Sequence, residues 1–348
     1  MTNHIINVGI AGFGMSGKIF QAPFLHADER FEIKKVFERS SEKSREEYPY
    51  VEVVHTFEEL LTDDIDLVII STPNAQHVPM ATKAIHAGKH VVVEKPIAAT
   101  SEEALELCAL AKKHKVLFSV YQNRRLDGDF VTLKKLIEEN RLGEVVDYEA
   151  HFDRFVMGAS SKKWKYENPV GADVLYDLGV HIIDQAYYLF GMPEEVYADF
   201  RKQREESSGI DNFEVILYYK DKKAILSASE VAAKQGPHYM VHGRKGTFIK
   251  FEMDLQESAL NEGKRPPSND WGLDKKEHYG TLSYEKDGSI VDEIITTERG
   301  DYGLFYDNFY HALIHNKELL VKPEEAADVL KILEAAIKSN SEKRRIEL

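Results

Sequence analysis

Along the first third of the chain, short runs of hydrophobic residues alternate with stretches in which hydrophobic positions recur at helical spacing. Two runs, Leu67–Ile70 and Val91–Val93, are apolar throughout, which is typical of strands covered on both faces. This alternation predicts a parallel sheet with crossover helices. The predicted strands are Ile5–Ile10, Glu32–Phe37, Val51–His55, Leu67–Ile70, His90–Val93 and Leu117–Tyr121. The predicted helices are Ser16–His26, Glu42–Glu47, Phe57–Thr62, His77–Ala87 and Ser101–His114, the last capped by its serine.

The pattern changes beyond residue 123. From Val196 to about Thr297, β-branched and aromatic runs are separated by short turns such as Gly236-Pro237, which indicates an antiparallel or mixed sheet. A further strand is predicted at Val145–Val156. Helices are predicted at Asp129–Glu139, Val174–Leu189 and Pro323–Ser339. We therefore expect two domains, residues 1–122 and residues 123–348.

Composition narrows the function classes. A chain of 348 residues with 43% hydrophobic and 30% charged residues is typical of a globular protein of about two domains. The net charge of −14 argues against nucleic-acid binding, because no basic stretch is present to contact phosphates. The single cysteine, Cys108, excludes an internal disulfide and falls in a helical apolar pattern. With no apolar run of membrane-spanning length and no leader pattern, we expect no membrane association and a cytoplasmic protein.

The first candidate site is a glycine-rich turn between the first predicted strand and the first helix. Its residues are Gly12, Phe13, Gly14, Met15, Ser16 and Gly17. In a strand–turn–helix context this spacing predicts dinucleotide binding, because the glycines permit a tight turn and a close approach to a pyrophosphate. The free amides at the helix start then face a negative group.

The end of the second strand gives conflicting signals for the cofactor. Glu38 stands where an acid would bind the ribose 2′-hydroxyl of NAD. Arg39, Ser40 and Lys43 follow it and suit a 2′-phosphate. Solvated charges at a helix start would explain the same residues. We expect NADP, with NAD still possible, because Arg39 is a planar donor and Glu38 is able to turn outward.

Polar residues also follow the fourth and fifth strands. Thr72, Pro73, Asn74 and His77 would line the cofactor at the carboxyl ends of the strands. Asn74 would alternatively serve as a helix cap. Glu94 and Lys95 end the apolar run that begins at His90, and a lysine there is costly to bury unless a ligand or charge partner uses it.

Asp177 and His181 stand four residues apart in a predicted helix, so both side chains would face the same way. Imidazole titrates near neutral pH and is able to take a hydroxyl proton, while Lys95 would stabilise the charge that develops on the oxygen. Taken alone, such a pair is more often a structural hydrogen bond. Together with the glycine turn and Lys95, it indicates catalysis, with Lys95, His181 and Asp177 as the catalytic residues.

The segments Tyr121–Phe130, Leu175–Gln185 and Asn269–Gly272, together with the glycine turn and Glu94-Lys95-Pro96, resemble the Gfo/Idh/MocA oxidoreductases. Within that family the motifs are most similar to the branch of NADP-dependent scyllo-inositol dehydrogenases. The resemblance implies a Rossmann domain over residues 1–122. It implies over residues 123–348 an α/β domain whose large open, predominantly antiparallel sheet often forms a homodimer or homotetramer.

The resemblance also implies reversible hydride transfer between the nicotinamide and a secondary hydroxyl of a cyclic polyol or sugar. It places Asn123 beside nicotinamide and substrate. The expected substrate contacts are Lys95, Asn123, Arg124, Arg154, Trp164, Asp177 and His181. Asp184 completes a His-x-x-Asp pattern, but no metal is expected. Two other functions stay open: an aldose 1-dehydrogenase, and a non-catalytic sensor that binds the dinucleotide.

Overall fold

The computed structural model describes residues 4–156, 173–205 and 209–348 and divides into two compact units. The first unit consists of residues up to Asn123 with Gln256–Trp271 and Asp301–Ala327. The second consists of Arg124–Leu255, Gly272–Gly300 and Asp328–Leu348. The later segments of the first unit thus come from residues that the expected boundary at 122/123 places in the second domain. Within the described residues, no helix combines the length and apolar composition needed to cross a bilayer.

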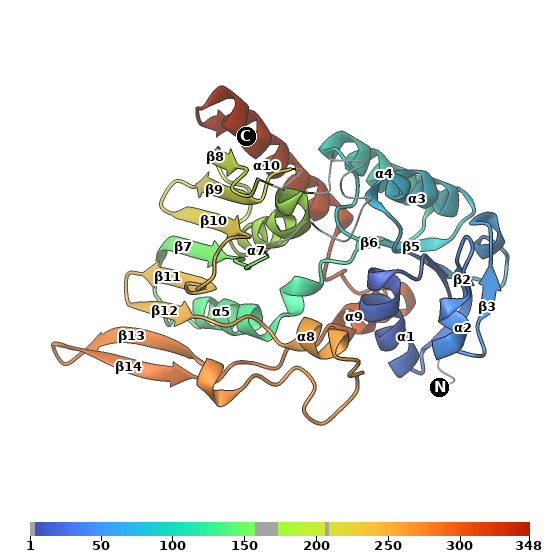
Figure 1. Cartoon of the computed structure of the whole chain (residues 1–348), viewed down its shortest axis with the longest axis horizontal. Helices are drawn as coiled ribbons and strands as arrows, with labels where there is room; N and C mark the ends of the chain where they lie inside the picture. Colours follow the sequence, from blue (N-terminus) through green and yellow to red (C-terminus); the bar gives the residue numbers. More distant parts are fainter. Residues whose placement is uncertain (1–3, 157–172, 206–208) are drawn as a thin grey trace. The chain divides into compact units, whose positions relative to one another are not determined.

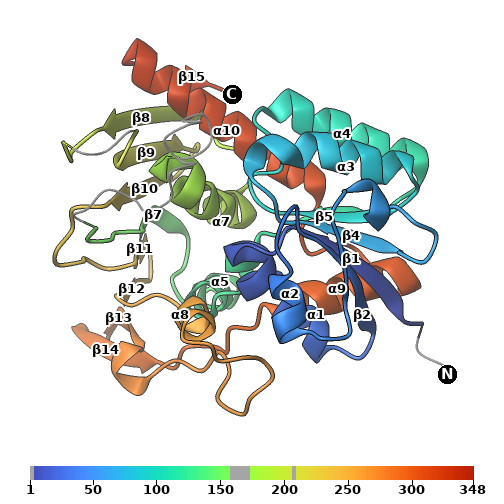
Figure 2. The ribbon, with the colours of Figure 1, turned by 45° about the vertical axis from the view of Figure 1, so that its right-hand side comes forward.

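The first unit contains a parallel sheet of six strands in the order β3-β2-β1-β4-β5-β6 (Figure 1). Its strands are β1 (Ile6–Ala11), β2 (Phe31–Phe37), β3 (Glu52–Val54), β4 (Leu67–Ile70), β5 (His90–Val93) and β6 (Phe118–Val120). Its helices are α1 (Ala22–Ala27), α2 (Lys43–Glu47), α3 (His77–His86), α4 (Ser101–His114), α8 (Gln256–Asn261) and α9 (Gly303–His315). Helices α3 and α4 lie on one face, and α1 and α9 on the other (Figures 1 and 2). The sheet is the predicted Rossmann sheet.

Local chemistry explains where these elements begin. Strands β4 and β5 are buried at nearly every position because helices cover both faces. The predicted Ser101 cap of α4 is wrong by one residue. Thr100 is the N-cap, because its side chain accepts from the backbone N–H of Glu103 while the Glu103 side chain accepts from the Thr100 backbone. The first predicted helix begins as a π-helical segment, Ser16–Gln21, before α1.

The second unit contains a mixed, mostly antiparallel sheet of nine strands in the order β14-β13-β12-β11-β7-β10-β9-β8-β15. Its strands are β7 (Val145–His151), β8 (Glu195–Arg201), β9 (Asn212–Tyr218), β10 (Lys223–Ser229), β11 (Tyr239–Gly243), β12 (Gly246–Lys250), β13 (Gly280–Lys286), β14 (Ser289–Ile295) and β15 (Ile346–Glu347). Only the β7–β10 pair is parallel among the pairings of this sheet. The expected open, predominantly antiparallel sheet is confirmed.

Helices cover one face of this sheet. They are α5 (Gly128–Glu138), α7 (Val180–Phe190) and α10 (Pro323–Glu342), the last of which begins in the first unit. Buried residues alternate with partly exposed ones along β9 and β10, so one face packs in the core and the other does not. A second π-helical segment, Leu175–Gly179, precedes α7.

Candidate active site

The glycine-rich turn in the first unit fits a dinucleotide. Gly12 has φ +94° and leads directly from β1 into the turn. A Cβ on Gly17 would lie 2.2 Å from the Gly12 carbonyl oxygen, so only glycine permits this packing. A Cβ on Gly14 would meet nothing within 4 Å, which leaves open space beside the backbone. The strand order reverses between β1 and β4, which is where open α/β sheets bind a nucleotide.

Glu38 is turned onto the start of α2. Its buried carboxylate accepts hydrogen bonds from the Ser41 hydroxyl at 2.5 Å, the Lys43 amide at 3.1 Å, and the Ser44 amide and hydroxyl at 2.8 and 2.6 Å. Burial alone would raise the pKa of Glu38, but the donors from Ser41 and Ser44 outweigh it and hold the pKa below its usual value. Arg39, in contrast, is exposed. The acid at the ribose position is therefore already engaged within the protein.

The residues after β4 lie on a short 3-10 turn, Asn74–Gln76, that leads into α3. The N-cap position of α3 is Gln76, not Asn74, and the Gln76 side chain makes no cap hydrogen bond. Ser71, the first residue after β4, donates from its hydroxyl to the Gly12 carbonyl oxygen at 2.8 Å. This contact ties the end of β4 to the glycine turn.

Glu94 and Lys95 follow β5 and are both partly buried. The Glu94 carboxylate accepts from the Ser16 hydroxyl and from the Gln21 amide, both on the π-helical segment after the glycine turn. Burial raises the pKa of Glu94 despite these donors and the nearby Lys95 charge. Tyr306 on α9 donates to Gln21 and so holds its amide in place. Glu94, the residue before Lys95, is thus hydrogen-bonded to the segment that follows the predicted cofactor turn.

In the second unit, α7 carries His181, which is 6% exposed, and the π-helical segment before it carries Asp177. Asp184 pairs with the buried Arg125 guanidinium at 2.7 and 2.8 Å, which gives this carboxylate a structural role. Gln185 donates to the Arg124 carbonyl oxygen at 3.0 Å. The segment after Asn123 is therefore held by residues one turn beyond His181.

Two predicted substrate contacts lie around one aromatic ring. The guanidinium carbons of Arg124 and Arg154 lie 4.8 and 4.9 Å from the ring centroid of Phe152. Arg124 also forms an ion pair with Asp127 at 3.1 Å. Asn123, at the end of the first unit, is buried. Trp164 lies outside the described residues.

In each unit, the sequence analysis missed residues that hold the candidate site residues of that unit. Phe152, Gln21 and Tyr306 carry no motif, and an aromatic residue or an amide in an apolar pattern reads as ordinary core. Gln185 falls within the segment Leu175–Gln185, but it contacts the Arg124 backbone carbonyl, which is distant in sequence and close only in the folded chain. Within the described part of the chain, no three His, Cys, Asp or Glu side chains gather in a way that would hold a metal ion.

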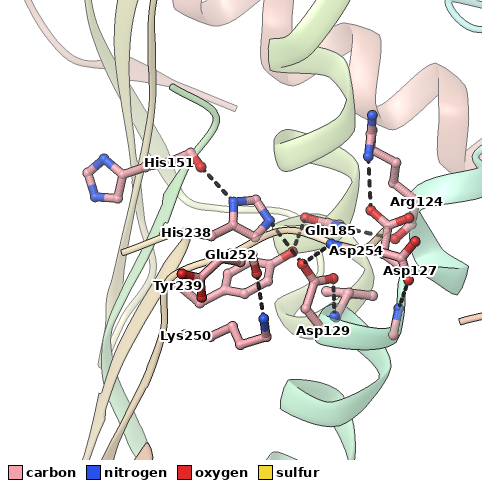
Figure 3. A network of polar contacts seen from close by, with 12 residues as sticks. Arg124, Asp127, Asp129, His151, Gln185, His238, Tyr239, Lys250, Glu252 and Asp254 are labelled. Carbon is pink, nitrogen blue, oxygen red and sulfur yellow. Dashed lines mark hydrogen bonds and ion pairs between the residues drawn. The ribbon is translucent and has the colours of Figure 1, made fainter. Parts of the chain in front are cut away.

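A buried polar network lies beneath the sheet of the second unit (Figure 3). The Asp129 carboxylate accepts from the amides of Phe130 and Asp254 at 2.7 and 3.0 Å, and the His238 Nε2 atom lies 3.7 Å away. Burial and the Asp254 charge raise the pKa of Asp129 to about 7. Burial lowers the pKa of His238 to about 3, so its ring is neutral and donates through Nδ1 to the His151 carbonyl oxygen.

This network predicts a pH dependence of stability. Because the folded-state pKa of Asp129 is raised, its protonated carboxyl contributes to the free energy of unfolding below about pH 4. This contribution is lost as the pH rises towards about 7, by at most about 1.4 kcal/mol per pH unit. In urea unfolding, the free energy of unfolding of Asp129→Asn relative to that of the parent should therefore be higher at about pH 8 than at about pH 5. Asp199→Asn, at an exposed ion pair with Arg201, is the control. An equal difference between Asp129→Asn and the parent at both pH values would contradict the expectation.

Comparison with known proteins decides the family. Residues 6–122 match the oxidoreductase family's NAD-binding Rossmann fold, and residues 134–348 match its C-terminal alpha/beta domain. The chain belongs to the Gfo/Idh/MocA oxidoreductase family. As a Gfo/Idh/MocA protein with this Rossmann domain and site, it is an NAD(P)-dependent dehydrogenase.

Several relatives match over nearly the whole chain. It is 39% identical to scyllo-inositol 2-dehydrogenase (NADP(+)) IolW of Bacillus subtilis, over 99% of this chain and 96% of that protein. It is 38% identical to the uncharacterized oxidoreductase YdgJ of Escherichia coli, over 96% of each chain. The structure of the putative oxidoreductase yvaA from Bacillus subtilis superposes with a TM-score of 0.97, at 38% identity and over 100% and 99% of the two chains. The Gfo/Idh/MocA assignment thus covers both units.

Proposed function

We propose that the chain is an NADP-preferring dehydrogenase that acts on a secondary hydroxyl of a cyclic polyol or sugar, scyllo-inositol being the first substrate to test. The full-length similarity to a scyllo-inositol 2-dehydrogenase supports the substrate class. The observation that carries the cofactor preference is the Glu38 carboxylate, which accepts from Ser41 and from the first residues of α2 while Arg39 is exposed.

The proposed chemistry divides between the cofactor and the chain. When bound, NADP supplies a nicotinamide ring that accepts or returns a hydride. Lys95 hydrogen-bonds the reacting oxygen and stabilises its negative charge. His181 exchanges the hydroxyl proton, and Asp177 orients the substrate or tunes the imidazole. We assign proton transfer to Lys95 and His181 as a pair, without an order between them.

Substrate would contact Arg124, Arg154 and Asn123 as well. The Phe152 ring holds both guanidinium groups within 5 Å, so their planar donors are pre-positioned for hydroxyl oxygens. Trp164 stays in the proposed substrate set on the strength of the family resemblance alone. Absorbance of the reduced nicotinamide, followed across a panel of polyols and aldoses with each cofactor, tests the proposal. Turnover with an aldose and with no polyol would overturn the substrate class.

Arg39 should decide the cofactor preference. Arg39→Ala is expected to lower kcat/KM for NADP by roughly 10- to 100-fold, the loss expected for one charge-assisted contact to a 2′-phosphate, and to leave NAD unchanged. Arg45→Ala is the matched control, because Arg45 lies on α2, a few residues after Arg39, and pairs with Glu42 at 2.6 Å. If kcat/KM of the parent for NAD equals or exceeds that for NADP, and Arg39→Ala changes neither value, the NADP preference is wrong.

The face of the nine-stranded sheet that the described helices leave uncovered should bind a second copy of the chain. The strand register aligns one row of side chains across this face, and six of them are large and apolar: Tyr197, Ile216, Ile225, Met240, Ile249 and Ile294. Ile294 is 63% exposed, and such a row is typical of a protein interface. Light scattering should show a dimer or tetramer, and Ile216→Lys should shift it to monomer. A monomeric parent at micromolar concentration would contradict this interface.

A further inference from the structure

The imidazole of His77 contacts two backbone carbonyl oxygens. Its Nδ1 atom lies 2.8 Å from the Pro96 oxygen and its Nε2 atom lies 2.9 Å from the Thr72 oxygen, and the residue is 1% exposed. A carbonyl oxygen only accepts hydrogen bonds, and a neutral imidazole carries one N–H. Both contacts are therefore hydrogen bonds only when both ring nitrogens are protonated.

The surroundings of His77 within the protein oppose that charge. Burial is the largest influence and, with the nearby Lys95 ammonium, lowers the pKa of His77. His77 is also the first residue of α3, where the helix dipole disfavours a cation. The Glu94 carboxylate interacts with the Lys95 charge, and burial raises the pKa of Glu94. In the protein without a ligand, His77 is neutral and one carbonyl faces a ring lone pair.

His77 joins the two loops that border the predicted cofactor site. Thr72 follows β4 directly after Ser71, whose hydroxyl donates to the Gly12 carbonyl in the glycine turn. Pro96 follows Lys95 at the end of β5. A dinucleotide on the carboxyl ends of these strands brings the negative charge of its phosphates to the same edge. In a buried, low-dielectric setting that charge favours a cation at His77.

We propose that His77 takes up one proton when the dinucleotide binds and, as an imidazolium, clamps the Thr72 and Pro96 carbonyls together. The proton comes from solvent and adds to the unprotonated ring nitrogen; no other bond changes. His77 then acts as a positioning residue, because the carbonyl it holds adjoins Lys95. The inference rests on the proposed use of NADP.

Proton-linked binding has a measurable consequence. Between the pKa of His77 in the free protein and its higher pKa in the complex, dinucleotide affinity should fall with rising pH, by up to tenfold per pH unit for one proton. Lys95 and Glu94 face the same edge, so a pH profile alone would not identify the group. Variants and ring spectra distinguish them.

Calorimetry counts the proton. NADP is titrated into the full-length protein in phosphate and in Tris at about pH 8, where a phosphate monoester with pKa near 6 stays fully ionised and contributes no proton. The buffer dependence of the enthalpy should show an uptake approaching one proton, and His77→Asn should lose most of it. His90→Asn is the matched control, because His90 Nδ1 accepts from the Leu117 amide at 2.9 Å and gains nothing from a second proton.

Ring ¹⁵N spectra of the unsubstituted protein decide the matter if His77→Asn does not fold. The His77 signals should show one protonated nitrogen in the free protein and two in the NADP complex. Equal enthalpies in both buffers, or a ring that keeps a single proton in the complex, would overturn the inference while leaving NADP binding intact. No binding heat for NADP or NAD with the folded protein would instead refute the proposed function.

Discussion

Replacing Lys95 with alanine is expected to lower kcat by about 10²–10³-fold, the range for removing one donor that stabilises a developing oxyanion. The KM for NADP should change little if the ammonium acts on the reacting oxygen. Lys95→Arg should restore little activity, because a planar guanidinium does not replace a compact ammonium. Steady-state rates with NADP and the best polyol of the panel measure the effect.

Lys83→Ala is the matched control for this variant. Lys83 lies in the same unit, and its exposed ammonium pairs with Glu58 at 2.6 Å. Both variants should keep the circular dichroism spectrum of the parent. Turnover of Lys95→Ala equal to that of Lys83→Ala would remove Lys95 from catalysis and favour the non-catalytic sensor.

Replacing His181 with alanine is the second large expected effect, a loss of about 10²–10⁴-fold in kcat for alcohol oxidation. Oxidation needs an unprotonated base, so kcat/KM of the parent should rise with pH to a plateau. His181→Ala should lose that rise, which a merely structural change would not remove. Asp177→Asn should keep the rise but shift its midpoint.

The control for His181→Ala is His278→Ala. His278 lies in the same unit and its Nδ1 atom is 3.2 Å from Asp274. A pH profile of His181→Ala that is parallel to that of the parent would exclude His181 as the proton acceptor. Loss of activity in His278→Ala with an unchanged profile would show that the unit tolerates histidine loss poorly.

The sequence patterns predicted accurately the bounds of two strands that border the candidate cofactor site. β4 and β5 have the predicted bounds, because an apolar run covered on both faces stands out from the polar residues that flank it. Helix α9 was not predicted. Its buried residues include Phe305, Tyr306 and Phe309, which lie on one side of the helix, so the helical spacing was present in the sequence and was missed.

Parts of the site depended on tertiary contacts that no local pattern encodes. The sequence left Glu38 and Arg39 in conflict, and the structure resolves the position of Glu38 because Ser41 and Ser44 fold back onto it. The expected outward orientation of Glu38 is wrong. The π-helical segments before α1 and α7 also carry no residue signature, although such segments are frequent at functional sites.

Deuterium transfer tests the central claim most directly. The protein is incubated with NADP and a polyol that carries deuterium on its carbinol carbons, and the cofactor is then analysed by mass spectrometry. The proposed function predicts reduced cofactor that has gained one deuterium, a product that Lys95→Ala forms far more slowly. Unlabelled cofactor with every polyol and aldose of the panel, using folded protein that binds NADP, would contradict it.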